Sequence, residues 1–255
     1  MNIHRATACR RRRHGRCVRI KDRTGQTERV DSSIDSRAIH TVSARPRNVP
    51  RLALFDLDGT LADSRDLMFE ALDQAARHFG FRRIDRTEAE ALRDRDARTI
   101  LRVLGVPLWK LPSIAAHIKG LATAAPPPPL FPGTTAMLAR LRAAGVTLAL
   151  VSSNSEVNAR RALGAEASCC IGHWACDATL FGKASRFRQV LRRTGLLPGE
   201  AIAIGDELRD IAAARSAGLV AGAVAWGYAL PSALAAAEPD ILFASMAEIP
   251  AFFAA

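Results

Sequence analysis

Two aspartates lie one residue apart at the end of an apolar run, in the stretch LALFDLDGTLADS (residues 52–64). Buried charges are rare unless they are paired or bind a metal, and two carboxylates this close repel each other without a shared cation. Asp56 and Asp58 point to the same side of an extended chain. Gly59 lets the backbone turn, and Thr60 adds a hydroxyl beside the carboxylates. The stretch predicts a metal site at the end of a buried strand.

Polar side chains also follow later apolar runs or begin helices. They are Ser152, Ser153 and Asn154 after one run, Asp206 and Asp210 after another, and Lys183 at the start of an expected helix. Parallel strands bring their carboxyl ends to one edge of a sheet, and open α/β sheets bind ligands just outside that edge. We therefore expect these groups to meet Asp56 and Asp58 in space.

The elements that must position these groups alternate along the chain. Strands are expected at residues 52–55, 146–151, 201–204, 219–225 and 240–243, with helices at 134–144, 156–163, 184–194 and 208–217. The apolar runs lack alternation, which is typical of strands covered on both faces. Strand and helix alternation predicts an α/β fold with a doubly wound parallel sheet.

Three parts are predicted along the chain. Helical periodicity, beginning after Ser64 as a helix cap and ending before the proline run at 126–129, fills the interval between the first two strands. The parts are a basic N-terminal extension at 1–48, an α/β core formed by 49–65 and 131–255, and an all-helical cap at 66–130, called the helical insert below.

Positive charge is concentrated near the N-terminus. Residues 1–48 hold 13 of the 36 Lys and Arg residues but only 4 of the 25 Asp and Glu residues, so they carry nine of the eleven net positive charges. The segment includes Arg10 to Arg13 and shows no apolar periodicity, so we expect it to be disordered. It could be a dispensable extension, an arm attracted to nucleic acid or membranes, or a targeting segment. The remainder of the chain is nearly neutral.

Cysteine usage and hydropathy indicate a soluble cytoplasmic protein. The five cysteines are odd in number and unevenly placed, which argues against a disulfide framework. No run approaches the roughly 18 to 20 apolar residues of a membrane-spanning helix. In CCIGHWAC, Cys170, His173 and Cys176 have metal-ligand side chains, but buried or loop thiols fit the isolated motif better. His173 and Trp174 are alternatively candidates for lining a substrate pocket.

Four of these features occur in an order that resembles a known superfamily. DLDGT (56–60), Ser152, Lys183 and GDELRD (205–210) resemble the four motifs of the haloacid dehalogenase superfamily. The resemblance covers about residues 52–228, and the helical insert is similar to a C1-type cap. It implies a Rossmann-like core and is closest to phosphoglycolate phosphatase-like members.

The resemblance implies a role for each residue. Asp56 would attack phosphorus and form an aspartyl-phosphate, and Asp58 would act as general acid and base. Asp56, the Asp58 carbonyl and Asp206 would bind Mg²⁺, while Asp210 would hold a ligating water or Lys183. Ser152 and Lys183 would cradle the transferred phosphoryl group.

Further substrate contacts are predicted at Thr60, Ser153, Asn154 and Arg98. Arg98 lies in RDRDARTIL (93–101) of the helical insert and could grip a substrate carboxylate, although a solvated face of Arg and Asp pairs is the simpler interpretation. Ser152 could equally be a helix cap, Lys183 a solvated helix start, and Asp210 a first-turn carboxylate.

The sequence thus predicts a Mg²⁺-dependent phosphatase for a small phosphate monoester, with phosphoglycolate as a candidate. A phosphomutase would use the same core. A dehalogenase has no alkoxide to protonate, so Asp58 argues against it. From a different class, a nucleic-acid-binding protein would use the arginines of residues 1–48. The expected partner is a small phosphorylated metabolite, with no membrane and with nucleic acid bound only through that arm.

Overall fold

A computed structural model describes residues 19–21, 27–29 and 49–254. The chain divides into two units, residues 1–40 and 41–255. In the first unit, strands β1 (Arg19–Lys21) and β2 (Thr27–Arg29) pair in antiparallel fashion. Most of residues 1–48, including the arginine run, lie outside the described residues, so the predicted disorder stays a prediction.

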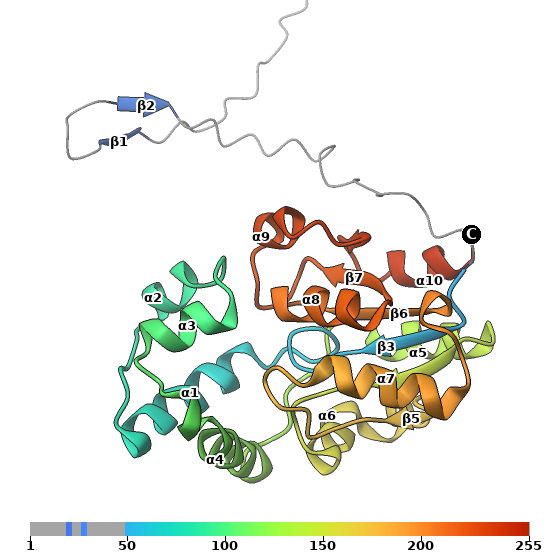
Figure 1. Ribbon diagram of the computed structural model, residues 1–255, viewed down its shortest axis with the longest axis horizontal. Helices are drawn as coiled ribbons and strands as arrows, with labels where there is room; N and C mark the ends of the chain where they lie inside the picture. The colour runs from blue at the N-terminus through green and yellow to red at the C-terminus, as the bar shows by residue number, and fades with distance from the viewer. Residues whose placement is uncertain (1–18, 22–26, 30–48, 255) are drawn as a thin grey trace, which may run out of the picture. The chain divides into compact units, whose positions relative to one another are not determined.

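The second unit is built on a parallel sheet, drawn in Figure 1. Its six strands follow the order β5-β4-β3-β6-β7-β8, and every neighbouring pair is parallel. In chain order they are β3 (Leu52–Phe55), β4 (Thr147–Leu150), β5 (His173–Trp174), β6 (Ala201–Gly205), β7 (Val220–Val224) and β8 (Ile241–Phe243). The predicted doubly wound α/β fold is confirmed.

Helices cover both faces of this sheet, as Figure 1 shows. One face packs against α5 (Thr134–Ala143), α6 (Glu156–Ser168) and α10 (Glu248–Phe253), and the other against α7 (Lys183–Thr194), α8 (Leu208–Ala217) and α9 (Pro231–Ala236). Along β3, Ala53 and Phe55 join the first core, whereas Leu52 and Leu54 join the second. Because all four side chains are buried, the strand is apolar without alternation.

The helical insert runs between β3 and β4. Its helices are α1 (Arg65–Phe79), α2 (Arg86–Ala91), α3 (Ala97–Val103), η1 (Leu108–Lys110) and α4 (Leu111–Ala124). A small apolar cluster of its own contains the buried side chains of Ala75, Leu104, Val106 and Ile114. The helices match the predicted content of residues 66–130, while the division into cap and core domains stays a prediction.

Several short elements were not predicted. The two-residue strand β5 forms one edge of the sheet, and α9 and α10 follow β7 and β8. The helix expected at 156–163 extends to Ser168 across a break at Gly164, whose backbone is not helical. Segments of two to six residues carry too few side chains to show a periodicity, so tertiary packing decides them.

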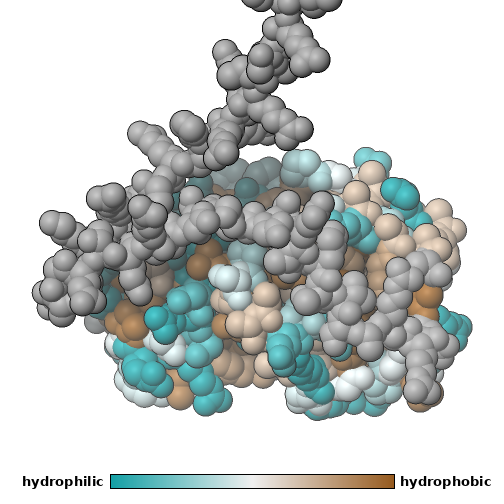
Figure 2. Space-filling view, turned by 90° about the horizontal axis from the view of Figure 1, so that it is seen from above, coloured by the Kyte–Doolittle hydropathy of each residue, from teal (hydrophilic) through white to brown (hydrophobic). Residues whose placement is uncertain are grey.

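Within the described residues, no single helix combines the length and apolarity needed to cross a membrane. The pair Ala97–Val103 and Leu108–Ala124, bent by 104°, would meet both criteria only together. Hydrophilic and hydrophobic residues are intermixed on the coloured surface in Figure 2. Among the described residues, Trp109 is the most exposed large apolar side chain, followed by Leu197 and then by Leu108 and Val157.

Candidate active site

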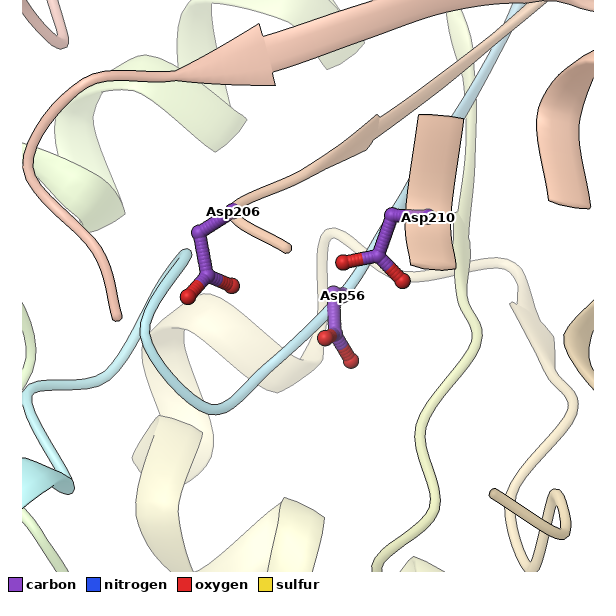
Figure 3. A group of neighbouring side chains, drawn as sticks. All are labelled: Asp56, Asp206 and Asp210. Carbon is purple, nitrogen blue, oxygen red and sulfur yellow. The ribbon is translucent and has the colours of Figure 1, made fainter. Parts of the chain in front are cut away.

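Three carboxylates converge where β3 and β6 end. Asp56 directly follows β3 and Asp206 follows β6, and the parallel pairing of these strands places the two aspartates side by side. Asp210 reaches the same point from the first turn of α8. Carboxylate oxygens of the three residues lie within 4.8 Å of one another. Figure 3 shows the three side chains gathered at this point. The predicted convergence of these three residues is therefore found in the structure.

Lys183 supplies the positive charge inside this cluster. Its side chain is only 3% exposed, and its Nζ lies 2.5 Å from Asp56 Oδ2 and 2.5 Å from Asp210 Oδ1. Burial favours the neutral amine, but Asp210 and Asp56 outweigh it, so the pKa of Lys183 is raised above its ordinary value. The interpretation of Lys183 as a solvated helix start is thus wrong.

The three carboxylates do not share one electrostatic environment. Burial raises the pKa of Asp56 to about 6, although Lys183 opposes the shift. Burial also raises the pKa of Asp206 well above its usual range, reinforced by Glu207 and Asp56. Burial disfavours the charge of Asp210 as well, but Lys183 and Arg209 outweigh it and lower the pKa. One lysine therefore stabilises Asp210 as an anion and leaves Asp56 and Asp206 short of positive charge.

This shortage of positive charge indicates that the site could hold a cation. Asp56, Asp206 and Asp210 offer only carboxylate oxygens, the ligands that a hard divalent cation such as Mg²⁺ prefers. A cation bound there would supply positive charge to the two carboxylates whose pKa values are raised, chiefly by burial and in part by neighbouring carboxylates. The donor set therefore fits a divalent metal.

Asp206 is held in place from two sides. Thr60 Oγ1 donates to its Oδ1 over 2.8 Å, and the Tyr228 backbone N–H donates to its Oδ2 over 2.8 Å. Gly59 has a φ of +78°, and a Cβ there would overlap the Asp206 carboxylate. Thr60 is fully buried, so its hydroxyl positions Asp206, whereas the sequence suggested a substrate contact.

Asp58 lies apart from the three-carboxylate cluster. Its Oδ1 accepts a 2.7 Å hydrogen bond from Ser64 Oγ. Burial raises the pKa of Asp58, and the bond from Ser64 opposes that shift. Ser64 stands at the N-cap position of α1, but its side chain makes no capping bond. The predicted capping role of Ser64 is therefore wrong, because its hydroxyl is used at the site.

The stretch after β4 forms a compact turn. Ser152 is fully buried, and its Oγ accepts the backbone N–H of Asn154 over 3.0 Å. Ser155 caps α6 by accepting from the backbone of Asn158 at 3.2 Å, so the alternative of a Ser152 cap is wrong. The side-chain oxygen of Asn154 accepts the Asn158 amide over 3.0 Å, and Ser153 is partly exposed.

Arg98 lies at the edge of the helical insert. It is exposed, and its guanidinium carbon lies 5.1 Å from the ring centre of Phe181, two residues before Lys183. The neighbouring Arg95 instead pairs with Asp94 at 3.0 Å on the surface. Arg98 therefore contacts Phe181 of the α/β core part, while its binding to a substrate carboxylate stays a prediction.

Sequence reasoning missed Arg209 and Tyr228. Arg209 donates to Glu207 Oε1 over 2.5 Å and to the Leu180 carbonyl over 3.4 Å, while its buried Nε has no partner among the described residues. Tyr228 reaches Asp206 through its backbone and Ser64 through its hydroxyl. The position of Arg209 inside GDELRD is a usable signal, whereas nothing in the sequence around Tyr228 marks it.

The cysteine and histidine motif does not form a metal centre. Among the described residues, the Asp cluster is the only group of three or more His, Cys, Asp or Glu side chains close enough to share an ion. His173 and Trp174 form β5, and Arg160 covers the Trp174 ring at 3.9 Å. Burial raises the pKa of Cys176 to about 12. These residues support the interpretation as structural thiols, and Trp174 is covered by a core helix.

A family model for haloacid dehalogenase-like hydrolases matches residues 53–224. A phosphoglycolate phosphatase from Synechococcus elongatus is 33% identical over 198 residues, covering 77% of this chain and 93% of that protein. The tyrosine-protein kinase PtkA from Mycobacterium tuberculosis is 30% identical over 195 residues, covering 73% of this chain and 66% of that protein.

Solved structures agree with the fold. A haloacid dehalogenase-like family hydrolase from Streptococcus pneumoniae superposes with a TM-score of 0.67 at 21% identity, covering 80% of this chain and 99% of that one. The family match includes Asp56, Lys183 and Asp206, the residues that meet at the sheet edge. The chain is therefore a phosphatase-type hydrolase that belongs to the haloacid dehalogenase-like family.

Proposed function

We propose that this protein is a Mg²⁺-dependent phosphatase that hydrolyses a small phosphate monoester through a covalent intermediate on Asp56. The observation that carries the proposal is the contact between Asp56 and Lys183 beside Asp206 at the ends of two paired strands. Lys183 favours the ionised form of Asp56, which is the form that can attack phosphorus.

The reaction needs two displacements at phosphorus. A carboxylate oxygen of Asp56 forms a bond to phosphorus while the bond to the ester oxygen breaks, and the leaving alkoxide takes a proton from Asp58. Asp58 then accepts a proton from the water that attacks the aspartyl-phosphate, which releases phosphate and restores Asp56. The raised pKa of Asp58 supports this exchange, because a carboxyl must carry a proton in the first step.

The transferred group bears negative charge that must be stabilised. Lys183 Nζ lies beside Asp56 and supplies a fixed positive charge close to the incoming phosphoryl group. The buried Ser152 hydroxyl, on the neighbouring strand end, keeps its proton for a further hydrogen bond, because its Oγ accepts the Asn154 N–H. Lys183 and Ser152 thus contribute to catalysis mainly by positioning the phosphoryl group and stabilising its negative charge.

We assign Asp56, Asp206 and Asp210 as the carboxylates that hold Mg²⁺, with the Asp58 carbonyl as a further ligand. Thr60 and the Tyr228 N–H fix the orientation of Asp206 toward this position. Bound Mg²⁺ would neutralise charge on the phosphoryl oxygens and relieve the repulsion among the carboxylates.

The substrate is proposed to be a small metabolite with a second anionic group. A site that recognises only a phosphoryl group cannot distinguish esters, so selectivity must come from the helical insert. Arg98 of the insert contacts the ring of Phe181, two residues before Lys183, which makes it a candidate for this contact. The Synechococcus relative is a phosphoglycolate phosphatase, which makes phosphoglycolate the first substrate to test.

A panel of phosphate monoesters, assayed for released phosphate with Mg²⁺ and with excess chelator, tests this function. We expect Mg²⁺-dependent release and the highest kcat/KM for a small carboxylate-bearing ester. Phosphate returned to a bound sugar phosphate, with no net release, would instead identify a phosphomutase. No turnover of any monoester, or full activity in chelator, would refute the proposal.

A further inference from the structure

A chain of hydroxyl groups leads from Tyr228 to Asp58. Ser64 Oγ lies 2.6 Å from Tyr228 Oη and 2.7 Å from Asp58 Oδ1. A serine hydroxyl has one proton, and Ser64 donates it to the Asp58 carboxylate. The Tyr228 hydroxyl must then be the donor to Ser64. An ordinary phenol carries its proton at neutral pH, so the Tyr228 hydroxyl has the proton that this bond needs.

The same tyrosine also contacts the opposite side of the site. Its backbone N–H donates to Asp206 Oδ2 over 2.8 Å, while the Ala229 N–H reaches the Asp206 carbonyl over 3.3 Å. Tyr228 follows β7 by four residues, on the loop that leads to α9. One residue therefore fixes the metal-binding carboxylate with its main chain and the acid–base carboxylate with its side chain.

Arginines at the helical insert hold this loop from outside. Arg93 Nε donates to the Tyr228 carbonyl over 2.8 Å, and a terminal nitrogen of Arg93 reaches the Gly227 carbonyl over 3.2 Å. Arg65, at the start of α1, donates to the same Gly227 carbonyl over 2.7 Å. The Leu230 N–H returns a 3.0 Å bond to the Arg93 carbonyl. The loop is thus tied to the insert by both side-chain and main-chain bonds.

We propose that Tyr228 is a positioning residue that orients Asp58 through Ser64, and that Arg93 links this orientation to the docking of the helical insert. The proposal rests on the proposed phosphatase function, because it concerns proton donation to the leaving group. When the insert is docked, Arg93 would fix the position of the loop that carries Tyr228. The Tyr228 hydroxyl, through Ser64, would then keep the Asp58 side chain in one rotamer.

Replacing Tyr228 with Phe removes the hydroxyl and leaves the ring and the backbone N–H in place. The expected loss depends on the leaving group, since an alkoxide needs a proton and a nitrophenolate does not. We expect kcat/KM for phosphoglycolate to fall by about tenfold, the scale of one hydrogen bond, with less than about a twofold change for para-nitrophenyl phosphate. The ratio kcat/KM is used because it reports the first displacement, before both substrates share the same phosphoenzyme.

Ser64→Ala should give the same leaving-group-dependent loss, because it interrupts the same chain. The double variant with Tyr228→Phe should then lose no more than Ser64→Ala alone, whereas independent contributions would multiply. Calorimetric titration with Mg²⁺ should show affinity in Tyr228→Phe within about twofold of the parent, because the N–H bond to Asp206 remains.

Arg93→Met tests the link to the insert, with Arg82→Met as its matched control. Arg82 is an arginine of the same insert, and within the described part of the chain its side chain pairs only with Glu88, on the exposed surface. We expect Arg93→Met to reproduce the selective loss for phosphoglycolate and Arg82→Met to behave as the parent. Equal kinetics for the two variants would overturn the link.

Outcomes for the tyrosine itself are equally distinct. Equal loss on both substrates in Tyr228→Phe, or no loss on either, would overturn its positioning role while the parent's Mg²⁺-dependent turnover still supports the phosphatase. A parent enzyme that releases no phosphate from any monoester of the panel would instead refute the function on which the inference rests.

Discussion

Removal of the buried lysine should destabilise the protein far more than removal of a surface lysine. Lys183 is 3% exposed and lies between Asp56 and Asp210, which are 7% and 5% exposed. Lys183→Met keeps the length of the side chain but leaves two buried carboxylates without their partner. Breaking a buried ion pair in this way costs about 3–5 kcal/mol.

That free energy is large enough to measure by thermal unfolding. For a unit of 150–250 residues, each kcal/mol lowers Tm by about 2–4 °C, so we expect a decrease of roughly 6–20 °C. Lys119→Met is the matched control, because Lys119 pairs with Asp177 at 2.7 Å with side chains 30% and 56% exposed. An exposed pair of this kind contributes about 0–1 kcal/mol.

Two conditions should restore part of the lost stability in Lys183→Met. Mg²⁺ should raise its Tm by supplying positive charge to the same carboxylates. Lowering the pH from 7 to 5 should also help, because loss of the lysine raises the pKa of Asp56 further and the folded protein then binds a proton. If the free energy of unfolding of Lys183→Met lies within about 1 kcal/mol of that of Lys119→Met, the account of buried carboxylates that depend on Lys183 for positive charge is wrong.

Three further predictions address the metal, the packing and the N-terminus. Because the pKa of Asp56 is raised to about 6 from 3.8, the metal-free folded protein holds a proton between about pH 4 and pH 6 that the unfolded chain has lost. Chemical denaturation in chelator should therefore show the contribution of Asp56 to stability falling by about 2 kcal/mol as pH rises from 4 to 7, and Mg²⁺ should abolish this trend; a rise in stability with pH in chelator would contradict it. Gly59→Ala should weaken Mg²⁺ binding and lower stability by about 1–3 kcal/mol more than Gly105→Ala, because both have positive φ but only the first would push a Cβ into Asp206; equal effects would refute the packing argument. A chain that begins at residue 49 should keep kcat and KM within about twofold and lose any binding to nucleic acid, and a large loss of activity would show that the removed residues serve the site.

The sheet edge was predictable because parallel topology is a strong constraint. Residues that directly follow parallel strands lie at one edge of the sheet, which the sequence predicts; the pairing of β3 with β6 then brings Asp56 and Asp206 together. Lys183 and Asp210 were placed by their order in the motifs, and their contact at 2.5 Å is found in the structure. The chemistry assigned to each residue stays a prediction.

Other features depend on tertiary packing that local sequence does not encode. Ser64 has the residue type and position of a helix cap, yet its hydroxyl donates to the nearby Asp58 and makes no bond to the backbone of α1. Tyr228 lies on a loop after β7, and its contacts with Ser64 and Asp206 arise only when the sheet is assembled. Arg65 and Arg93 similarly bind backbone carbonyls, and a contact to the backbone cannot be predicted from a pattern of side chains.

The central claim is that Asp56 becomes phosphorylated during turnover. Rapid acid quench of the enzyme with a phosphate-labelled monoester and Mg²⁺ measures the acyl phosphate. Reduction of a parallel unlabelled sample with tritiated borohydride, which converts the phosphorylated aspartate to homoserine and releases phosphate, followed by peptide mapping, locates the residue. We predict a hydroxylamine-sensitive label at Asp56 that appears and decays at rates compatible with kcat, and no label in Asp56→Asn. Turnover without a covalent label in the parent enzyme, or a label that persists in Asp56→Asn, would contradict the account.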